Sequence, residues 1–293
     1  MKLPPKTCIK SPWLVPFTGK FQVAKSATLA EDYPDKKTCK KQLEKKVDEL
    51  AELQRVLYAS DTYSVLLVFQ AMDAAGKDST IRAALSGVDP AGFQVYSFKQ
   101  PSARELDHDF LWRSVQRLPQ RGRIGVFNRS YYEETLVVRV HPEYLQSQKL
   151  PGKINLKTFW DERYESIADH EKHLARSGTV IIKFWLNVSR DEQRRRFLSR
   201  LDETEKNWKF SAGDVEERQH WEEYMQAYEA VLNATTKPWA PWYAIPADDK
   251  PYMRLCVAET IVQTLKQLEL NYPQVTDKQE STFASMRKRL EQD

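Results

Sequence analysis

The stretch "SVLLVFQAMDAAGKDST", residues 64–80, places the strongest constraint on the fold. It begins with a continuous apolar run of the kind that is buried in a parallel sheet, continues through small residues, and ends in a pattern compatible with a helix. That order of strand, loop and helix is the context of a phosphate-binding loop, whose usual pattern is G-x-x-x-x-G-K-S/T. Here Ala71 occupies the first glycine position, and Asp78 separates Lys77 from the hydroxyl group of Ser79. The stretch therefore predicts a phosphate-binding loop of modified composition.

The loop residues have the chemistry that a phosphate requires. Backbone N–H groups and the positive end of the following helix dipole would converge on the phosphate, and Gly76 would allow a close approach. Lys77 would add a mobile ammonium group. We expect the phosphate to be bound by Ala75, Gly76, Lys77, Asp78 and Ser79.

Asp73 is the unusual member of the loop. A carboxylate there would repel phosphate unless a divalent cation lay between them, so we expect Asp73 to bind Mg²⁺ directly or through water. Asp78 has two interpretations, an outer partner of the same cation or a favourable charge at the helix N-terminus. An alternative is that Asp73 or Asp78 only caps the helix, which would explain the turn but not Lys77.

Strands and helices alternate along the rest of the chain. Five apolar runs are predicted strands: residues 64–70, 94–100, 124–130, 179–188 and 242–248. Helical periodicity covers residues 36–59, 77–86, 103–117, 156–176, 190–201, 215–233 and 252–268. Such alternation predicts an α/β fold in which helices cover both faces of a parallel sheet and ligands bind at the carboxyl ends of the strands.

We expect one folded core with appendages. Residues 1–58 would form an N-terminal arm followed by an amphipathic helix, and residues 59–272 would form the core. The core would include a lid at about residues 190–214, and residues 273–293 would form a charged C-terminal tail.

The end of the third predicted strand carries polar residues of the same site. Asn128 occupies the position at which ordinary P-loop enzymes have a metal-binding aspartate, and it can supply a neutral oxygen but no charge. Arg129 follows directly, and an arginine beside a metal site favours a phosphate clamp over a solvated charge. Glu133, four residues on, could reach the same cleft.

The segment after the fourth predicted strand is strongly basic. Between Arg194 and Lys209 it has six basic and three acidic residues, a local net charge of +3. Arg196 and Arg200 would lie on one helical face as like charges, so we expect an anion to relieve their repulsion. A solvated basic face is the alternative. Nucleotide kinases carry an arginine-rich lid at this place in the chain, which favours phosphate binding.

Composition excludes several classes of protein. The chain of 293 residues has a formal net charge of +4, which favours anionic ligands only weakly. Its three cysteines are too widely spaced for a metal pair or a disulfide framework, so we expect a reducing, cytoplasmic location. No stretch approaches the length of about 18 apolar residues that suggests a membrane span, and we expect no export signal. The five histidines show no metal-ligand pattern.

Five segments together resemble polyphosphate kinase family 2: "MDAAGKDST", "DHDFLWR", "FNRSYYEE", "NWKFSAGD" and "APWYAIPADDK". They occur in the order typical of that family, and the similarity covers roughly residues 35–272. The resemblance implies a three-layer P-loop kinase fold similar to thymidylate kinase, with a helical lid. It also implies reversible, Mg²⁺-dependent phosphoryl transfer between inorganic polyphosphate and nucleotides. In this family the loop lacks the first glycine and carries the aspartate, so Ala71 and Asp73 are usual there.

The resemblance also implies roles for individual residues. Asp73 would hold Mg²⁺, with Mn²⁺ as an alternative, while Lys77 and Arg129 would contact the phosphates at the reaction centre. The phosphate path and the lid would be lined by Arg82, Arg113, Arg196, Arg200 and Lys209. The nucleotide would be bound by Asn128, Arg129 and Glu133. Asn128 and Glu133 are similar to class III members, which phosphorylate both nucleoside monophosphates and diphosphates.

The implied partners are inorganic polyphosphate and adenine or guanine nucleotides, with neither nucleic acid nor membrane, and the implied assembly is a dimer or tetramer of identical chains. One alternative is a nucleoside or nucleotide kinase that uses ATP as donor, which the modified loop disfavours. Another is a nonenzymatic nucleic-acid-binding protein with a decayed loop. The absence of basic strands interleaved with aromatic residues disfavours that class.

Overall fold

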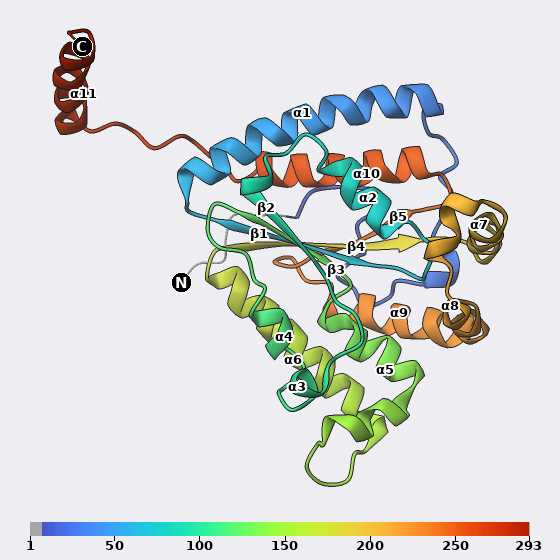
Figure 1. Ribbon diagram of the computed structural model, residues 1–293. Helices are drawn as coiled ribbons and strands as arrows, with labels where there is room; N and C mark the ends of the chain where they lie inside the picture. The colour runs from blue at the N-terminus through green and yellow to red at the C-terminus, as the bar shows by residue number, and fades with distance from the viewer. Residues whose placement is uncertain (1–7, 293) are drawn as a thin grey trace.

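A five-stranded parallel sheet forms the centre of the protein in the computed structural model, which describes residues 8–292 (Figure 1). Its strand order is β2-β3-β1-β4-β5. The strands are β1 (Ser64–Gln70), β2 (Phe93–Ser97), β3 (Ile124–Asn128), β4 (Thr179–Asn187) and β5 (Trp242–Pro246). The predicted α/β fold with a parallel sheet is confirmed. Because all strands run the same way, their carboxyl ends meet at one edge of the sheet.

The inner strands are apolar because both of their faces are covered. Every residue of β1, β3, β4 and β5 is buried, whereas the edge strand β2 is partly exposed. Continuous apolar runs without alternation are the expected sequence of strands that are buried on both faces.

Helices cover both faces of this sheet (Figure 1). One face carries α1 (Lys36–Ser60), α2 (Lys77–Ala84) and α10 (Lys250–Lys266), and α1 packs along α10. The other carries α5 (Val137–Val140), α6 (Leu156–Arg176) and α9 (Trp221–Thr235). The predicted amphipathic helix is α1, which buries Leu50 and Leu57 in the main core.

The N-terminal arm closes the outer edge of the sheet. Leu14 forms an antiparallel bridge with Tyr243 of β5. The backbone N–H of Val15 donates to the carbonyl of Trp242 at 2.9 Å, and the Ala244 N–H donates to the carbonyl of Trp13 at 2.8 Å. The arm thus satisfies backbone groups that an edge strand would leave unpaired. The first seven residues of the predicted arm, and residue 293 of the predicted tail, lie outside the described residues.

The helix predicted over residues 103–117 is wrong, because two four-residue helices replace it, α3 (Ala103–Leu106) and α4 (Trp112–Val115). A capping box between Ser102 and Glu105 begins α3. The intervening turn is stabilised by the carboxylate of Asp109, which accepts the Leu111 N–H at 2.9 Å. An aspartate that bonds to nearby backbone in this way competes with helical hydrogen bonding.

The helix predicted over residues 215–233 is also divided, into α8 (Ala212–Glu217), a 3₁₀ turn and α9. The basic segment forms α7 (Arg190–Asp202), close to its predicted bounds. The structure adds α11 (Asp277–Leu290) within the charged C-terminal segment, where it lies away from the rest of the molecule (Figure 1). The 3₁₀ helices are Val23–Lys25, Pro90–Gly92, Tyr131–Thr135, Pro142–Gln148, Thr204–Lys209 and Arg218–His220.

A buried ion pair joins the elements beneath the sheet. The Lys183 ammonium of β4 donates to the Glu171 carboxylate of α6 at 2.6 Å, and both side chains are fully buried. The same ammonium donates to the Tyr132 hydroxyl and to the carbonyl of Thr235, each at 2.8 Å. Burial lowers the pKa of Lys183 to about 8. The network ties β4, α6 and α9 to the 3₁₀ helix Tyr131–Thr135, which follows directly on the polar end of β3.

We expect Lys183→Met to lower the free energy of unfolding by about 3–5 kcal/mol, because it leaves the Glu171 carboxylate buried without its cation. The double variant Lys183→Met/Glu171→Gln should recover much of this loss, since no buried charge remains. Urea denaturation of both variants measures the difference, with the exposed Lys41→Met as control. A single variant as stable as the control would contradict the network's structural role.

Candidate phosphate-binding site

The loop between β1 and α2 has the backbone conformation of an anion-binding turn. Ala74 and Gly76 have positive φ angles of 60° and 107°. The backbone N–H groups of residues 76–79 have no acceptor within the described part of the chain. A small-residue turn whose free N–H groups open onto a helix N-terminus is suited to bind phosphate.

Lys77 lies against the loop itself. Its ammonium group is buried and donates to the carbonyl of Ala71 at 2.7 Å and to the carbonyl of Met72 at 3.3 Å. Burial lowers the pKa of Lys77, and the charge of Asp73 partly offsets that effect. The lysine is therefore held at the loop rather than extended into solvent.

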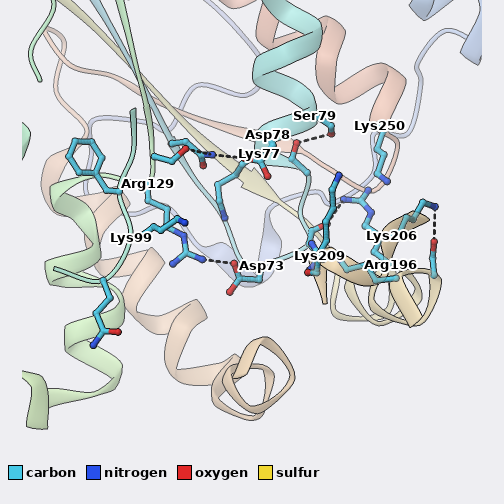
Figure 2. A pocket seen from close by; sticks show the side chains of 18 residues that line it. Asp73, Lys77, Asp78, Ser79, Lys99, Arg129, Arg196, Lys206, Lys209 and Lys250 are labelled. Atoms are coloured by element: carbon cyan, nitrogen blue, oxygen red, sulfur yellow. Dashed lines mark hydrogen bonds and ion pairs between the residues drawn. The ribbon is translucent and has the colours of Figure 1, made fainter. Parts of the chain in front are cut away.

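Asp73 and Arg129 meet across the loop, from the ends of β1 and β3 (Figure 2). The Arg129 guanidinium donates to Asp73 Oδ1 at 2.6 Å, and its other terminal nitrogen lies 3.6 Å from Glu133. Burial alone would raise the pKa of Asp73, but Lys77 and Arg129 bring it below its usual value. The Asp73 carboxyl therefore stays ionised at neutral pH.

Arg129 has a left-handed backbone conformation, with φ of 62°. This conformation costs an L-residue about 1–2 kcal/mol, so the surrounding structure must hold it in place. The Arg129 N–H donates to the carbonyl of Phe69 at 3.0 Å, and the side chain is fixed by Asp73. The strained backbone of Arg129 therefore lies where β3 ends, beside the β1–α2 loop.

Asn128 turns its amide nitrogen toward α2. Its Nδ2 donates to Asp78 Oδ1 at 2.5 Å and to the Ser97 hydroxyl at 3.4 Å. Asp78 therefore has a neutral partner from β3, and the amide oxygen of Asn128 accepts no hydrogen bond from residues 8–292.

Arg196 of α7 holds the loop from the opposite side. It is buried, and its guanidinium donates to the carbonyls of Ala75 and Ala247, each at 2.6 Å. Its Nε donates to Glu192 at 2.6 Å. Arg200, one turn on, pairs with Asp214 at 3.2 Å. The chain itself supplies acceptors for both arginines, and the expectation that a bound anion also relieves their repulsion stays a prediction.

These side chains surround a cavity of about 550 Å³ at the carboxyl edge of the sheet, as predicted for an α/β fold (Figure 2). Ten predicted site residues line it: Asp73, Gly76, Lys77, Asp78, Ser79, Asn128, Arg129, Arg196, Arg200 and Lys209. The cations around it greatly outnumber the carboxylates, so the cavity is suited to a polyanion.

Four other predicted residues do not line the cavity. Ala75 is fully buried, and Arg82 is exposed on α2. Arg113 is buried on α4, where it donates to the carbonyl of Lys99 at 2.7 Å and lies over the ring of Phe98. It therefore supports the segment that carries Lys99 into the cavity. Glu133 reaches the site only through Arg129.

The cavity is also lined by Lys99, which the sequence suggests as part of a basic channel, and by Lys206 and Lys250, which were not predicted to bind phosphate. Lys99 follows β2, and Lys206 lies in the basic segment, so both were within reach of sequence reasoning. Lys250 begins α10 directly after "IPADD". Lys250 could have been predicted from its position after the last predicted strand, since the carboxyl ends of parallel strands meet at one edge of the sheet.

The chain offers few donors for a metal ion. No group of three or more histidine, cysteine, aspartate or glutamate side chains is placed to hold one among residues 8–292. Mg²⁺ is commonly bound by one or two carboxylates together with substrate phosphates and water. Asp73 therefore fits such a cation, because one of its oxygens is held by Arg129 and the other has no bonded donor in the described structure.

We expect Arg196→Ala to lower the free energy of unfolding by about 2–4 kcal/mol, since it removes several buried charge-assisted hydrogen bonds. Arg200→Ala should cost less than about 1 kcal/mol, because its partly exposed ion pair is screened. Thermal or urea denaturation of the matched pair measures this contrast. Equal losses would show that Arg196 does not hold the loop.

Comparison with known proteins agrees with this geometry. The profile of the family described as Polyphosphate kinase 2 (PPK2) matches residues 33–273. An ADP-polyphosphate phosphotransferase of Rhodopseudomonas palustris is 55% identical over 259 residues, which cover 88% of this chain and 90% of the relative. An AMP/ADP-polyphosphate phosphotransferase of Meiothermus ruber is 46% identical over 225 residues, covering 77% and 80%. The crystal structure of polyphosphate kinase 2 from Arthrobacter aurescens superposes with a TM-score of 0.84 at 35% identity, covering 92% of this chain and 93% of the other. The chain belongs to the polyphosphate kinase 2 family.

Proposed function

We propose that this protein is a polyphosphate-dependent nucleotide kinase, which transfers phosphoryl groups reversibly between inorganic polyphosphate and nucleotides. The observation that carries the proposal is the cavity around the β1–α2 loop, where free backbone N–H groups face lysines and arginines from four parts of the chain. Phosphoryl transfer requires mainly positioning and neutralisation of charge. A site with these groups supplies both.

The loop residues have distinct parts in this proposal. The N–H groups of residues 76–79 bind the phosphoryl group that moves, and Lys77 fixes the loop while adding positive charge. Arg129 spreads its guanidinium over the same phosphates and keeps Asp73 in place. Groups that are fixed before the reaction stabilise developing charge without reorganisation.

Asp73 would hold the divalent cation that members of this family require, which we take to be Mg²⁺, with Mn²⁺ as an alternative. Bound there, the cation would neutralise the phosphate oxygens between which charge moves. Arg129 orients the carboxylate through Oδ1, which leaves the other oxygen for the cation.

The acceptor would be a nucleoside monophosphate or diphosphate, in practice AMP or ADP and their guanine counterparts. Glu133 supports this wider range because it lies 3.6 Å from Arg129 and shares with Asp73 the guanidinium that would contact the phosphates. Burial raises the pKa of Tyr228 of α9, and the charge of Glu133 adds to that effect. The Glu133 carboxylate therefore lies near both Arg129 and α9.

An ATP-dependent nucleotide kinase is less well supported. The lysines of residues 99, 206, 209 and 250 extend the positive charge well beyond the loop, as a long polyanion requires. The curated relatives above are also named for polyphosphate. A cytoplasmic location and a dimer or tetramer of identical chains remain predictions; no helix within the described residues is long and apolar enough to span a membrane.

The purified protein, given ADP, Mg²⁺ and polyphosphate without another donor, should form ATP. Asp73→Asn should lower this turnover by about 10²–10³-fold, because a charge that holds the cation in the transition state is lost. EDTA should abolish the wild-type reaction, and excess Mg²⁺ should restore it. Asp78→Asn is the matched control, with a smaller loss expected. Near-normal turnover of Asp73→Asn at saturating Mg²⁺ would contradict the assignment.

With AMP, Mg²⁺ and excess polyphosphate, the wild type should accumulate ADP first and ATP later, without added adenylate kinase. One added phosphate shifts the acceptor's terminal oxygen by a few ångströms, whereas attack requires about 3–3.5 Å between reacting atoms. Glu133→Asn should therefore change the AMP rate relative to the ADP rate, as followed by chromatography of the nucleotides. Equal loss of rate with AMP and with ADP would show that Glu133 does not set the position of the acceptor nucleotide.

A further inference from the structure

A second group of cations extends from the cavity onto α10 and α2. Lys250 is exposed at the first position of α10 and lines the cavity. Arg254 follows one turn later, and Arg82 lies near it on α2. We call Lys250, Arg254 and Arg82 the cation track. Figure 2 shows Lys250 beside Arg196, at the end of the pocket away from Arg129.

The members of the cation track have no acceptors of their own. None of the three side chains donates a hydrogen bond or forms an ion pair with any residue between 8 and 292. The Nε of Arg254 is buried without a partner among these residues. A buried donor that is left unpaired costs free energy, and most such groups in proteins have a partner.

The charges of these residues also oppose one another. Burial, followed by the charges of Arg196 and Arg254, lowers the pKa of Lys250 to about 8, although Glu192 partly offsets this effect. Burial, followed by the charges of Arg82 and Arg196, lowers the pKa of Arg254. The nearby carboxylate of Glu192 is already occupied by Arg195 and Arg196. No carboxylate among the described residues therefore forms an ion pair with a member of the cation track.

The position of the cation track identifies the ligand that it fits. Ser79 lines the cavity, and Arg82 lies three residues farther along α2, about 4.5 Å along the helix axis. Lys250 and Arg254 follow the same direction on α10, which packs against α2. An anion that occupied the cavity and continued outward would meet these three side chains in turn. A repeating chain of phosphates has that form, whereas a single nucleotide ends within the site.

We infer that Lys250, Arg254 and Arg82 bind the part of a polyphosphate chain that continues beyond the loop cavity, and that they set the preference for long chains over short ones. This inference rests on the proposed function. A donor short enough to lie within the cavity makes no contact with Arg254 or Arg82, so these two residues discriminate between chain lengths. Lys250 borders the cavity and therefore contributes to the binding of both short and long polyphosphate chains.

The test compares Arg254→Gln and Arg82→Gln with Arg289→Gln on the exposed helix α11, which has the same change of charge away from the site. At saturating ADP, each track variant should raise the KM for long-chain polyphosphate about fivefold, as expected for one partly screened ion pair. The KM for short-chain polyphosphate and for ADP should stay unchanged. The double variant should raise the long-chain KM further.

Two measurements separate anion binding from a structural role. Binding of fluorescent long-chain polyphosphate should show a shallower salt dependence in each track variant, because fewer counterions are released. The melting temperature without polyphosphate should not fall, since the variants remove a charge that is repelled by its neighbours. Arg82 is exposed, so Arg82→Gln tests the inference even where Arg254→Gln folds poorly.

Equal changes for long and short chains, a raised KM for ADP, or a lower melting temperature with an unchanged long-chain KM would overturn the inference. A wild type that makes ATP from neither chain length would instead refute the proposed function. A wild type that uses both chains, with variants that match Arg289→Gln, would refute the cation track alone.

Discussion

The site depends on the contact between the Arg196 guanidinium and the carbonyls of the β1–α2 loop. Arg196 lies 2.6 Å from the Ala75 carbonyl and 2.6 Å from the Ala247 carbonyl, so one planar group joins the loop to the end of β5. Lys77 holds the earlier carbonyls of the loop from within. Lys77 and Arg196 together bind the carbonyl groups of the loop. The N–H groups of residues 76–79 therefore stay available on the side that faces the cavity. A lysine in place of Arg196 would supply a flexible point charge, whereas the guanidinium presents its donors in a fixed fork.

The same arrangement divides the cations of the site into two kinds. Arg196, Arg129 and Arg200 have acceptors within the chain, and their positions are fixed before any substrate arrives. Lys250, Arg254 and Arg82 have none within the described residues, so their charge is available to an anion. Fixed cations favour precise positioning at the reaction centre, whereas unpaired cations favour affinity for a long, repeating polyanion. A site with paired and unpaired cations suits a protein of the polyphosphate kinase 2 family, to which the chain belongs.

Much of the fold was predictable because its signals are local. Each inner strand is an unbroken apolar run, and α1 and α6 show clear helical periodicity. The prediction over residues 103–117 was wrong because the carboxylate of Asp109, which accepts the Leu111 N–H, favours a turn at a place where apolar spacing alone indicates a helix. The N-terminal arm's pairing with β5 could not be predicted, since it joins segments that are more than 200 residues apart.

The sequence by itself determined the small-residue loop between β1 and α2, the parallel sheet and most of the residues that gather at its carboxyl edge. A strand, a small-residue loop and a helix form from neighbouring residues, and parallel strands bring their ends together in any α/β fold. Only the tertiary structure decided which cations are already paired. Arg196 and Arg200 read in sequence as two equivalent charges on one helical face, yet Arg196 is buried against carbonyls from two other segments and Arg200 is paired with Asp214. Those acceptors come from distant parts of the chain, so spacing along one helix cannot show which charges are left for a substrate.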